Sequence, residues 1–208
     1  MQRIRLVYSK GEELKFIGNL DMMKVWERTF RRSGLHIAYS QGFHPQPKIH
    51  QALPLPLGFT SENDLLDVWL VSEDDLSLIQ ERLEKALQPG ITVQEYQVIP
   101  PKVKPLQTLV TSASYIVNIE PENVPADLRE RIEYLLQQSE CPRERHGKQY
   151  DLRPLIESLQ VSGDDAGIVQ MTLSARPSAT GRPEEVLDAL NIPLQDVSIK
   201  RTELFLTE

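Results

Sequence analysis

The chain has 208 residues, one cysteine and a net charge of −7. This length suits one large domain or two small ones, and a single cysteine excludes a disulfide framework within the chain, which favours a reducing compartment. The chain begins with alternating charged and apolar side chains, unlike a signal peptide, and no apolar run approaches the length of a membrane span. We therefore expect a cytoplasmic globular protein that makes no membrane contact.

The charge is distributed unevenly along the chain. Residues 1–50 carry nine Lys or Arg and four Asp or Glu, whereas residues 51–100 carry two and nine. The acidic total argues against a general nucleic-acid binder. A basic first quarter on an acidic chain is nevertheless a local feature at which a partner is expected to bind.

The first half of the chain has the pattern β-α-β-β-α-β. Alternating or apolar runs predict strands over 3–9, 36–39, 65–71 and 91–99. Amphipathic periodicity predicts helices over 19–34 and 74–87. In the first helix we expect Asn19 as N-cap and an apolar stripe of Leu20, Met23, Trp26 and Phe30. Residues 41–58 contain four prolines and are expected to form a long loop.

The second half follows the same order more loosely. Residues 100–105, with three prolines, predict a stiff linker. Beyond it we expect strands over 114–119, 168–175 and 197–206, helices over 125–138 and 183–190, and a short helix begun near Asp151. The expected fold class is α+β, with two ferredoxin-like halves and antiparallel sheets. The expected domains are 1–100, which holds the basic helix and the proline-rich loop, and 106–208.

Several stretches together resemble a known family. They are YSKG (8–11), KF (15–16), NLD (19–21), FRRSGL (30–35), AYSQGFHPQPKI (38–49), PLPLG (54–58), DLRP (151–154), GRPEEVL (181–187) and RT (201–202). The chain resembles the radical-SAM-linked bacterial family of unknown function, whose members are encoded beside a radical SAM protein or fused to its C-terminus. The resemblance implies a radical SAM partner and a bacterial cytoplasm, but no reaction. Members usually carry histidine where this chain has Asn19, so a role for that histidine does not apply here.

Basic side chains share one face of the predicted first helix. They are Lys24, Arg28, Arg31 and Arg32, spaced i, i+4, i+7 and i+8. This spacing is typical of a ridge that contacts RNA phosphates, and also of an ordinary solvated helix face.

The loop that follows adds amide, aromatic and further basic side chains. They are Gln41, Phe43, His44, Gln46 and Lys48. This mixture suits single-stranded RNA, with Phe43 stacked on a base. The alternative is an arm that covers the sheet, with Phe43 in the core.

Other motifs favour structural roles. The turn before Pro183 predicts either a helix start or a phosphate site assisted by Arg182. Asp151 and Arg153 are expected to form an ion-paired helix cap rather than a catalytic pair. The irregular spacing of His36, His44, His50, His146 and Cys141 predicts no metal site, and three closely spaced cysteines for a radical SAM cluster are absent from the sequence. No cofactor and no catalytic residue are predicted.

Three classes of function remain open. The first is an RNA-recognition or substrate-presenting module, not an enzyme on its own, that works with a radical SAM enzyme in RNA modification. The second is a protein adaptor that docks on the radical SAM partner without contacting RNA. The third is a metal-independent RNA-cleaving enzyme, in which His44 or His50 would act as general acid or base.

Overall fold

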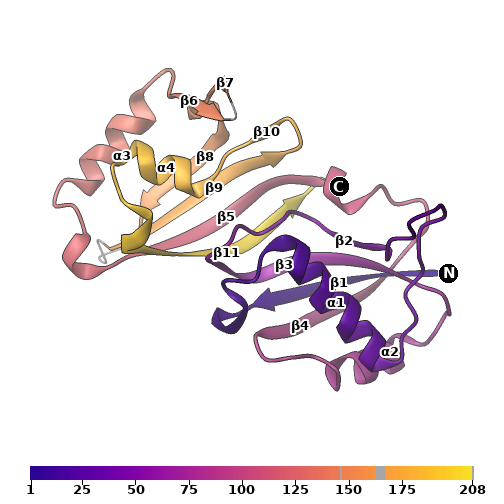
Figure 1. Ribbon diagram of the computed structural model, residues 1–208. Helices are drawn as coiled ribbons and strands as arrows, with labels where there is room; N and C mark the ends of the chain where they lie inside the picture. Colours follow the sequence, from indigo (N-terminus) through magenta and orange to yellow (C-terminus); the bar gives the residue numbers. More distant parts are fainter. Residues whose placement is uncertain (146, 163–166, 208) are drawn as a thin grey trace. The chain divides into compact units, whose positions relative to one another are not determined.

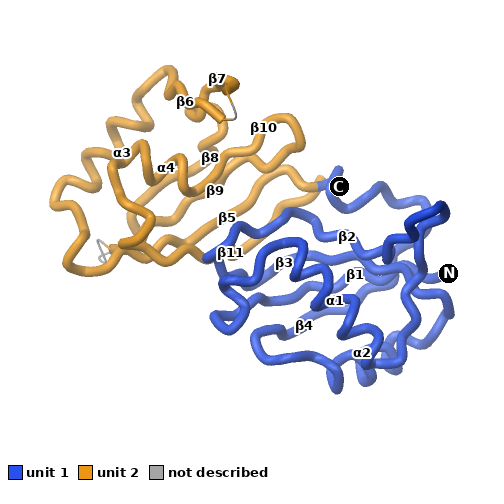
Figure 2. The backbone as a smooth tube through the Cα atoms, in the orientation of Figure 1, with its two compact units in different colours: residues 1–109, 208 blue, residues 110–207 orange. Residues whose placement is uncertain are grey.

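The computed structural model describes residues 1–145, 147–162 and 167–207. The chain divides into two compact units, unit 1 (residues 1–109) and unit 2 (residues 110–207), which Figure 2 shows in blue and orange. The division falls between Leu109 and Val110, a few residues beyond the segment predicted as a linker.

Unit 1 is a four-stranded antiparallel sheet with two helices. Its elements are β1 (Gln2–Lys10), α1 (Asn19–Ser33), β2 (Ile49–Gln51), β3 (Phe59–Leu70), α2 (Leu76–Glu84) and β4 (Ile91–Ile99) (Figure 1). The strands lie in the order β4-β1-β3-β2, and all three pairings are antiparallel. This is the ferredoxin-like arrangement.

Unit 2 has the same arrangement with an added hairpin. Its elements are β5 (Val110–Ile119), α3 (Leu128–Gln137), β6 (Pro142–Arg145), β7 (Lys148–Asp151), β8 (Ile156–Val161), β9 (Ile168–Arg176), β10 (Ala179–Thr180), α4 (Pro183–Ala189) and β11 (Val197–Leu206). The main strands lie in the order β11-β5-β9-β8, again antiparallel, and β10 extends the pairing of β9. The predicted α+β fold class with ferredoxin-like halves is therefore confirmed.

Two predicted elements are wrong in detail. The second strand of unit 1 is not 36–39, where Ile37 makes only an isolated bridge to Leu70, but Ile49–Gln51 in the proline-rich segment. Prolines are tolerated beside so short an edge strand because one of its sides needs no ladder hydrogen bonds. The short helix expected near Asp151 is a single 3-10 turn, Arg153–Leu155, between β7 and β8.

The apolar face of α1 differs from the predicted stripe. Met22, Trp26 and Phe30 are buried, while Leu20 is 78% exposed. Each helical residue turns about 100°, so Leu20 points about 200° away from Met22. The helix begins at Asn19, and Gly18 is the N-cap.

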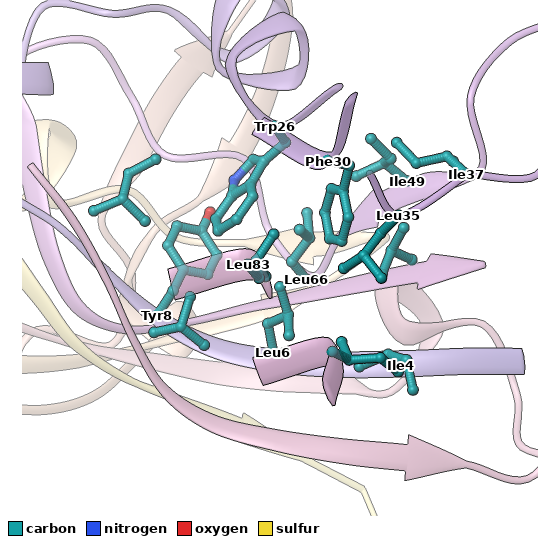
Figure 3. Close-up of a cluster of buried hydrophobic side chains, with 14 of the residues drawn as sticks. Ile4, Leu6, Tyr8, Trp26, Phe30, Leu35, Ile37, Ile49, Leu66 and Leu83 are labelled. Carbon is teal, nitrogen blue, oxygen red and sulfur yellow. The ribbon is translucent and has the colours of Figure 1, made fainter. Parts of the chain in front are cut away.

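The core of unit 1 lies between the helices and the sheet. The Trp26 ring meets the Tyr8 ring edge-on, with centroids 4.9 Å apart and planes at 82°. The centroid of the Phe30 ring lies 6.1 Å from that of Trp26. Figure 3 shows Trp26 and Phe30 over Tyr8 and Leu6 of β1, with Leu66 of β3 beside them. This packing fixes which side of α1 faces solvent.

The segment predicted as a linker packs on unit 1. The Arg3 guanidinium donates hydrogen bonds to the carbonyl oxygens of Val103 (2.7 Å) and Lys104 (3.0 Å), and Leu106 is fully buried. Proline restricts this segment, as expected, but hydrogen bonds and apolar burial hold it against the face of the sheet opposite α1.

Candidate functional site

The loop after α1 is closed by hydrogen bonds at its base. The amide N–H of Ser40 donates to the Gln46 carbonyl oxygen (2.8 Å), and the N–H of Gln46 donates to Ser40 Oγ (2.9 Å). Just outside this pair, Tyr39 and Pro47 form an antiparallel bridge. Residues 41–46, which we name the Phe43 loop, are therefore the tip of a narrow chain reversal between α1 and β2 (Figure 1).

Phe43 is entirely exposed at this tip, with a relative accessibility of 102%. The alternative that Phe43 belongs to the core is therefore wrong. Gly42 precedes it with φ = 128°, a conformation that side chains with a Cβ rarely adopt. The loop thus has backbone geometry that requires glycine at its turn and presents an aromatic ring to solvent.

A hydrogen bond ties the base of the loop to α1. The Tyr39 hydroxyl donates to Glu27 Oε1 at 2.9 Å, and this contact raises the pKa of Tyr39. Glu27 and Tyr39 also line a shallow hollow of about 150 Å³ together with Arg31 and His36. Because residues 27 and 39 carry no distinguishing pattern, the sequence contained no signal for this contact.

Two of the four basic residues on α1 have free side chains. Arg28 and Arg31 are exposed, and their guanidinium groups make no hydrogen bond or ion pair with any described residue. Lys24 is also exposed, but its Nζ lies 2.9 Å from Asp21 Oδ1. The structure therefore places Arg28 and Arg31 on the helix that anchors the Phe43 loop, with their charges available.

Arg32 and Lys48 are placed differently. The Arg32 guanidinium donates to the Ala86 carbonyl oxygen at 2.7 Å and so links α1 to the end of α2. Ile49 is buried opposite Val68 on the helix side of the sheet, so strand alternation directs Lys48 to the opposite face. These two cations do not extend the surface formed by Arg28 and Arg31. The polar loop residues Gln41, His44 and Gln46 are all exposed.

A buried charged cluster occupies the sheet face opposite α1. Asp67 is fully buried and accepts hydrogen bonds from Arg3 Nε (2.9 Å), Arg5 Nε (2.8 Å) and Arg5 Nη2 (3.0 Å). The Arg3 guanidinium also lies 5.0 Å from the Trp69 ring centroid. Alternation in β1 and an aspartate within an apolar strand were signals that could have predicted this cluster.

His50 lies beside the same cluster. Its ring meets Trp69 edge-on at 4.8 Å, and its buried Nδ1 has no hydrogen-bond partner among the described residues. Burial lowers the pKa of His50, although the nearby Asp67 carboxylate opposes that effect. His50 therefore lies with Trp69 behind the sheet, on the face away from α1.

In unit 2 the motif around Asp151 has a structural role. Asp151 Oδ1 accepts hydrogen bonds from the amides of Cys141 (2.7 Å) and Arg153 (2.9 Å). The expected ion pair with Arg153 does not form, because that guanidinium donates to the Leu136 carbonyl oxygen at 2.8 Å. Asp151 thus caps the turn and has no ionic partner among the described residues.

Arg182 lies exposed at the start of α4. The preceding amide, that of Gly181, donates to the Ser174 carbonyl oxygen at 2.9 Å and is therefore not available to a phosphate. Among the described residues, no group of three or more His, Cys, Asp or Glu side chains could hold a metal ion. His146, one of the residues considered for such a site, lies outside them. None of the described helices combines the length and the apolar character that a membrane span needs.

The fold and the exposed loop define a class of protein: two ferredoxin-like units, the first of which presents an aromatic loop beside a basic helix. The chain matches, over residues 3–183, the family described as uncharacterized protein conserved in bacteria (DUF2344). It belongs to that family.

Solved structures with a similar fold have little sequence in common with the chain. A chain of a Cbf5-Nop10-Gar1 complex is 9% identical, with a TM-score of 0.50, and the match covers 100% of the present chain and 50% of the other. A chain from the structure of an H/ACA RNP bound to a substrate RNA containing 2'-deoxyuridine is also 9% identical, with a TM-score of 0.47. That match covers 100% of the present chain and 49% of the other. A chain of the archaeal box H/ACA sRNP Nop10-Cbf5 complex is 9% identical, with a TM-score of 0.43, and the match covers 98% of the present chain and 48% of the other. The chain thus spans about half the length of these proteins, and the likeness concerns fold alone. No curated protein matched the chain.

Proposed function

We propose that this protein is an RNA-recognition module that presents a single-stranded RNA segment to a radical SAM enzyme. The observation that carries the proposal is the full exposure of Phe43 on a loop closed by hydrogen bonds. An exposed aromatic ring on an ordered loop offers a face on which an unpaired base stacks. Because the loop is already ordered, little conformational entropy is lost on binding.

The groups around Phe43 suit the rest of a nucleotide chain. Arg28 and Arg31 on α1 supply charge for phosphates, and Tyr39 ties the loop base to that helix through Glu27. Gln41, His44 and Gln46 offer donors and acceptors to base edges. Arg182 of unit 2 remains a proposed further RNA contact.

The radical SAM partner and the cytoplasmic location belong to this proposal through the family resemblance described above. In this arrangement the partner supplies the chemistry and its product is a modified RNA. The likeness to solved structures is confined to fold, so the proposal depends on the residues of the site.

Replacing Phe43 with Ala is expected to weaken binding of a short unstructured RNA by about 1–3 kcal/mol, the contribution of one stacked base. Stability should not change, because the ring contacts solvent. Fluorescence anisotropy at low salt measures the first quantity and urea denaturation the second.

The matched control is Tyr134→Ala, which removes another exposed aromatic ring from α3. It should leave RNA affinity unchanged. Equal RNA affinity in the wild type and the Phe43→Ala variant would show that the loop does not stack on RNA.

A second candidate function is the protein adaptor, and a separate apolar surface favours it. Phe16, Leu20 and Leu57 are 74%, 78% and 62% exposed, and the Gly58 amide donates to the Lys15 carbonyl oxygen at 3.0 Å, which joins two of these segments. Exposed apolar clusters commonly bind proteins.

The adaptor predicts that a Phe16→Ser, Leu57→Ser double variant loses a co-expressed radical SAM partner in a pull-down. Val71→Ser, which removes another exposed apolar side chain, is the control. Retention of the partner by the double variant would contradict the adaptor, and RNA binding by the same variant would favour the first proposal.

A further inference from the structure

Unit 2 contains a hollow that is lined by residues other than those of the Phe43 loop. Its volume is about 480 Å³, within the range of small-molecule sites. It lies among the β6–β7 hairpin, the turn before β8, and β10. The lining residues are Arg145, Lys148, Tyr150, Asp151, Leu155, Ser178, Ala179 and Thr180.

One wall of the hollow is a preorganised charged and aromatic unit. Arg145 Nη2 lies 2.6 Å from Glu185 Oε2 and 3.1 Å from the Thr180 carbonyl oxygen. The Arg145 guanidinium stacks 4.8 Å from the centroid of the Tyr150 ring. Burial, followed by the Glu185 carboxylate, raises the pKa of Tyr150 to about 12, so its hydroxyl stays protonated. The charges of Arg145 and Glu185 in this wall are therefore paired with each other and need no ligand.

Three polar groups of the lining are left over. Lys148 Nζ, Ser178 Oγ and Asp151 Oδ2 have no hydrogen-bond partner in the part of the chain that the structure describes, since Asp151 accepts both of its amide hydrogen bonds through Oδ1. The residues that line the hollow therefore include a cation, a hydroxyl and a carboxylate that each have an uncommitted polar atom, together with the apolar Leu155 and the aromatic Tyr150.

We propose that this hollow binds a cytidine 5'-monophosphate unit, whose base carries an exocyclic amino group. The base lies against Tyr150 and Leu155, the phosphate meets Lys148, and the amino group donates to Asp151 Oδ2. The unit comes either from a free nucleotide or from a nucleotide of a bound RNA. Only the second source rests on the function proposed above.

The carboxylate makes the site selective between two ligands of almost equal shape. Cytosine presents an amino donor at the position where uracil presents a carbonyl oxygen. A carboxylate oxygen accepts from the amino group and repels the carbonyl oxygen. One hydrogen bond to a charged group corresponds to a preference of about tenfold or more for CMP over UMP.

Calorimetric titration of the full chain with CMP and UMP tests the site. CMP is expected to bind at least about tenfold more tightly than UMP. In Asp151→Asn the side-chain oxygen can still accept hydrogen bonds from the amides of Cys141 and Arg153. The NH₂ group of the asparagine then takes the place of Oδ2. This variant should reverse the preference in favour of UMP.

The phosphate contact has its own variant. Lys148→Gln should lower CMP affinity several-fold while leaving cytidine affinity unchanged. The control Lys85→Gln, at the C-cap of α2 in unit 1, should alter neither affinity. Absence of CMP binding at millimolar concentration would overturn the proposal. So would equal CMP and UMP affinities that Asp151→Asn leaves equal.

A short oligocytidylate distinguishes the two sources. Displacement of CMP by the oligomer supports a nucleotide of an RNA, and CMP binding without displacement supports a free nucleotide. CMP binding by a chain that binds no RNA would remove the function proposed for the Phe43 loop and leave this site standing. RNA binding by a chain that binds no CMP would remove this site and leave the function proposed for the Phe43 loop standing.

Discussion

Replacing Asp67 with Ala is expected to lower the free energy of unfolding by about 3–5 kcal/mol, because it leaves two buried guanidinium groups without a counter-charge. Asp67 is fully buried, and the side chains of Arg3 and Arg5 are 5% and 11% exposed. The carboxylate accepts hydrogen bonds from both arginines, so its removal uncovers two charges at once. Urea denaturation followed by circular dichroism measures the change.

The same change should also loosen the segment that covers this face. Arg3 donates to Val103 and Lys104, and its position depends on Asp67. Amide hydrogen exchange within 100–109 should therefore increase in Asp67→Ala. An unfolding free energy within about 1 kcal/mol of the wild type would contradict this account of the cluster.

Two variants separate buried charge from charge in general. Glu81→Ala removes a carboxylate that pairs with Lys85 on the surface of α2, and it should have little effect because solvent screens exposed pairs. A triple variant with Arg3→Met, Arg5→Met and Asp67→Leu removes all three charges. It should recover most of the stability that Asp67→Ala removes, since the desolvation cost disappears with the charges.

The double variant Arg28→Gln, Arg31→Gln is expected to weaken binding of single-stranded RNA roughly 10- to 100-fold at about 50 mM salt. Each phosphate that the protein no longer neutralises on a single strand makes the slope of log affinity against log salt shallower by about 0.7, so two such phosphates change it by about 1.4. Both guanidinium groups are exposed and unpaired within the described residues. Anisotropy titrations at several salt concentrations measure the slope.

Arg82→Gln, Lys85→Gln is the matched control. It removes the same charge from the end of α2, where both residues are exposed. A surface at Arg28 and Arg31 predicts that this control keeps the wild-type slope. Equal changes of slope in the two double variants would indicate attraction by overall charge rather than binding at α1.

The order and type of most elements follow from the sequence because they depend on neighbouring residues. Alternation marks β1, and its apolar positions Ile4, Leu6 and Tyr8 are buried as a set. Pro183 locates the start of α4, whereas α2 ends at Glu84, earlier than the Pro89-Gly90 pair predicts. The exposure of Arg28 and Arg31 also follows, since their spacing separates them from Trp26 around the helix.

The exposure of Phe43 could not be predicted from its residue type. An aromatic residue in a loop either packs beneath it or points to solvent, and both arrangements agree with the local sequence. The hydrogen bonds between Ser40 and Gln46 and the bridge between Tyr39 and Pro47 determine which occurs. Those contacts depend on how the loop returns to the sheet.

The sequence by itself therefore determined the α+β class, the two helices of each unit and the outward spacing of Arg28 and Arg31 on α1, since these depend on local periodicity and charge spacing. Only the tertiary structure decided that β2 is Ile49–Gln51, that Lys48 faces away from α1, and that Glu185 meets Arg145 forty residues away in sequence. Such contacts join residues far apart in the chain. Their partners are selected by packing over the whole unit, which local patterns do not contain.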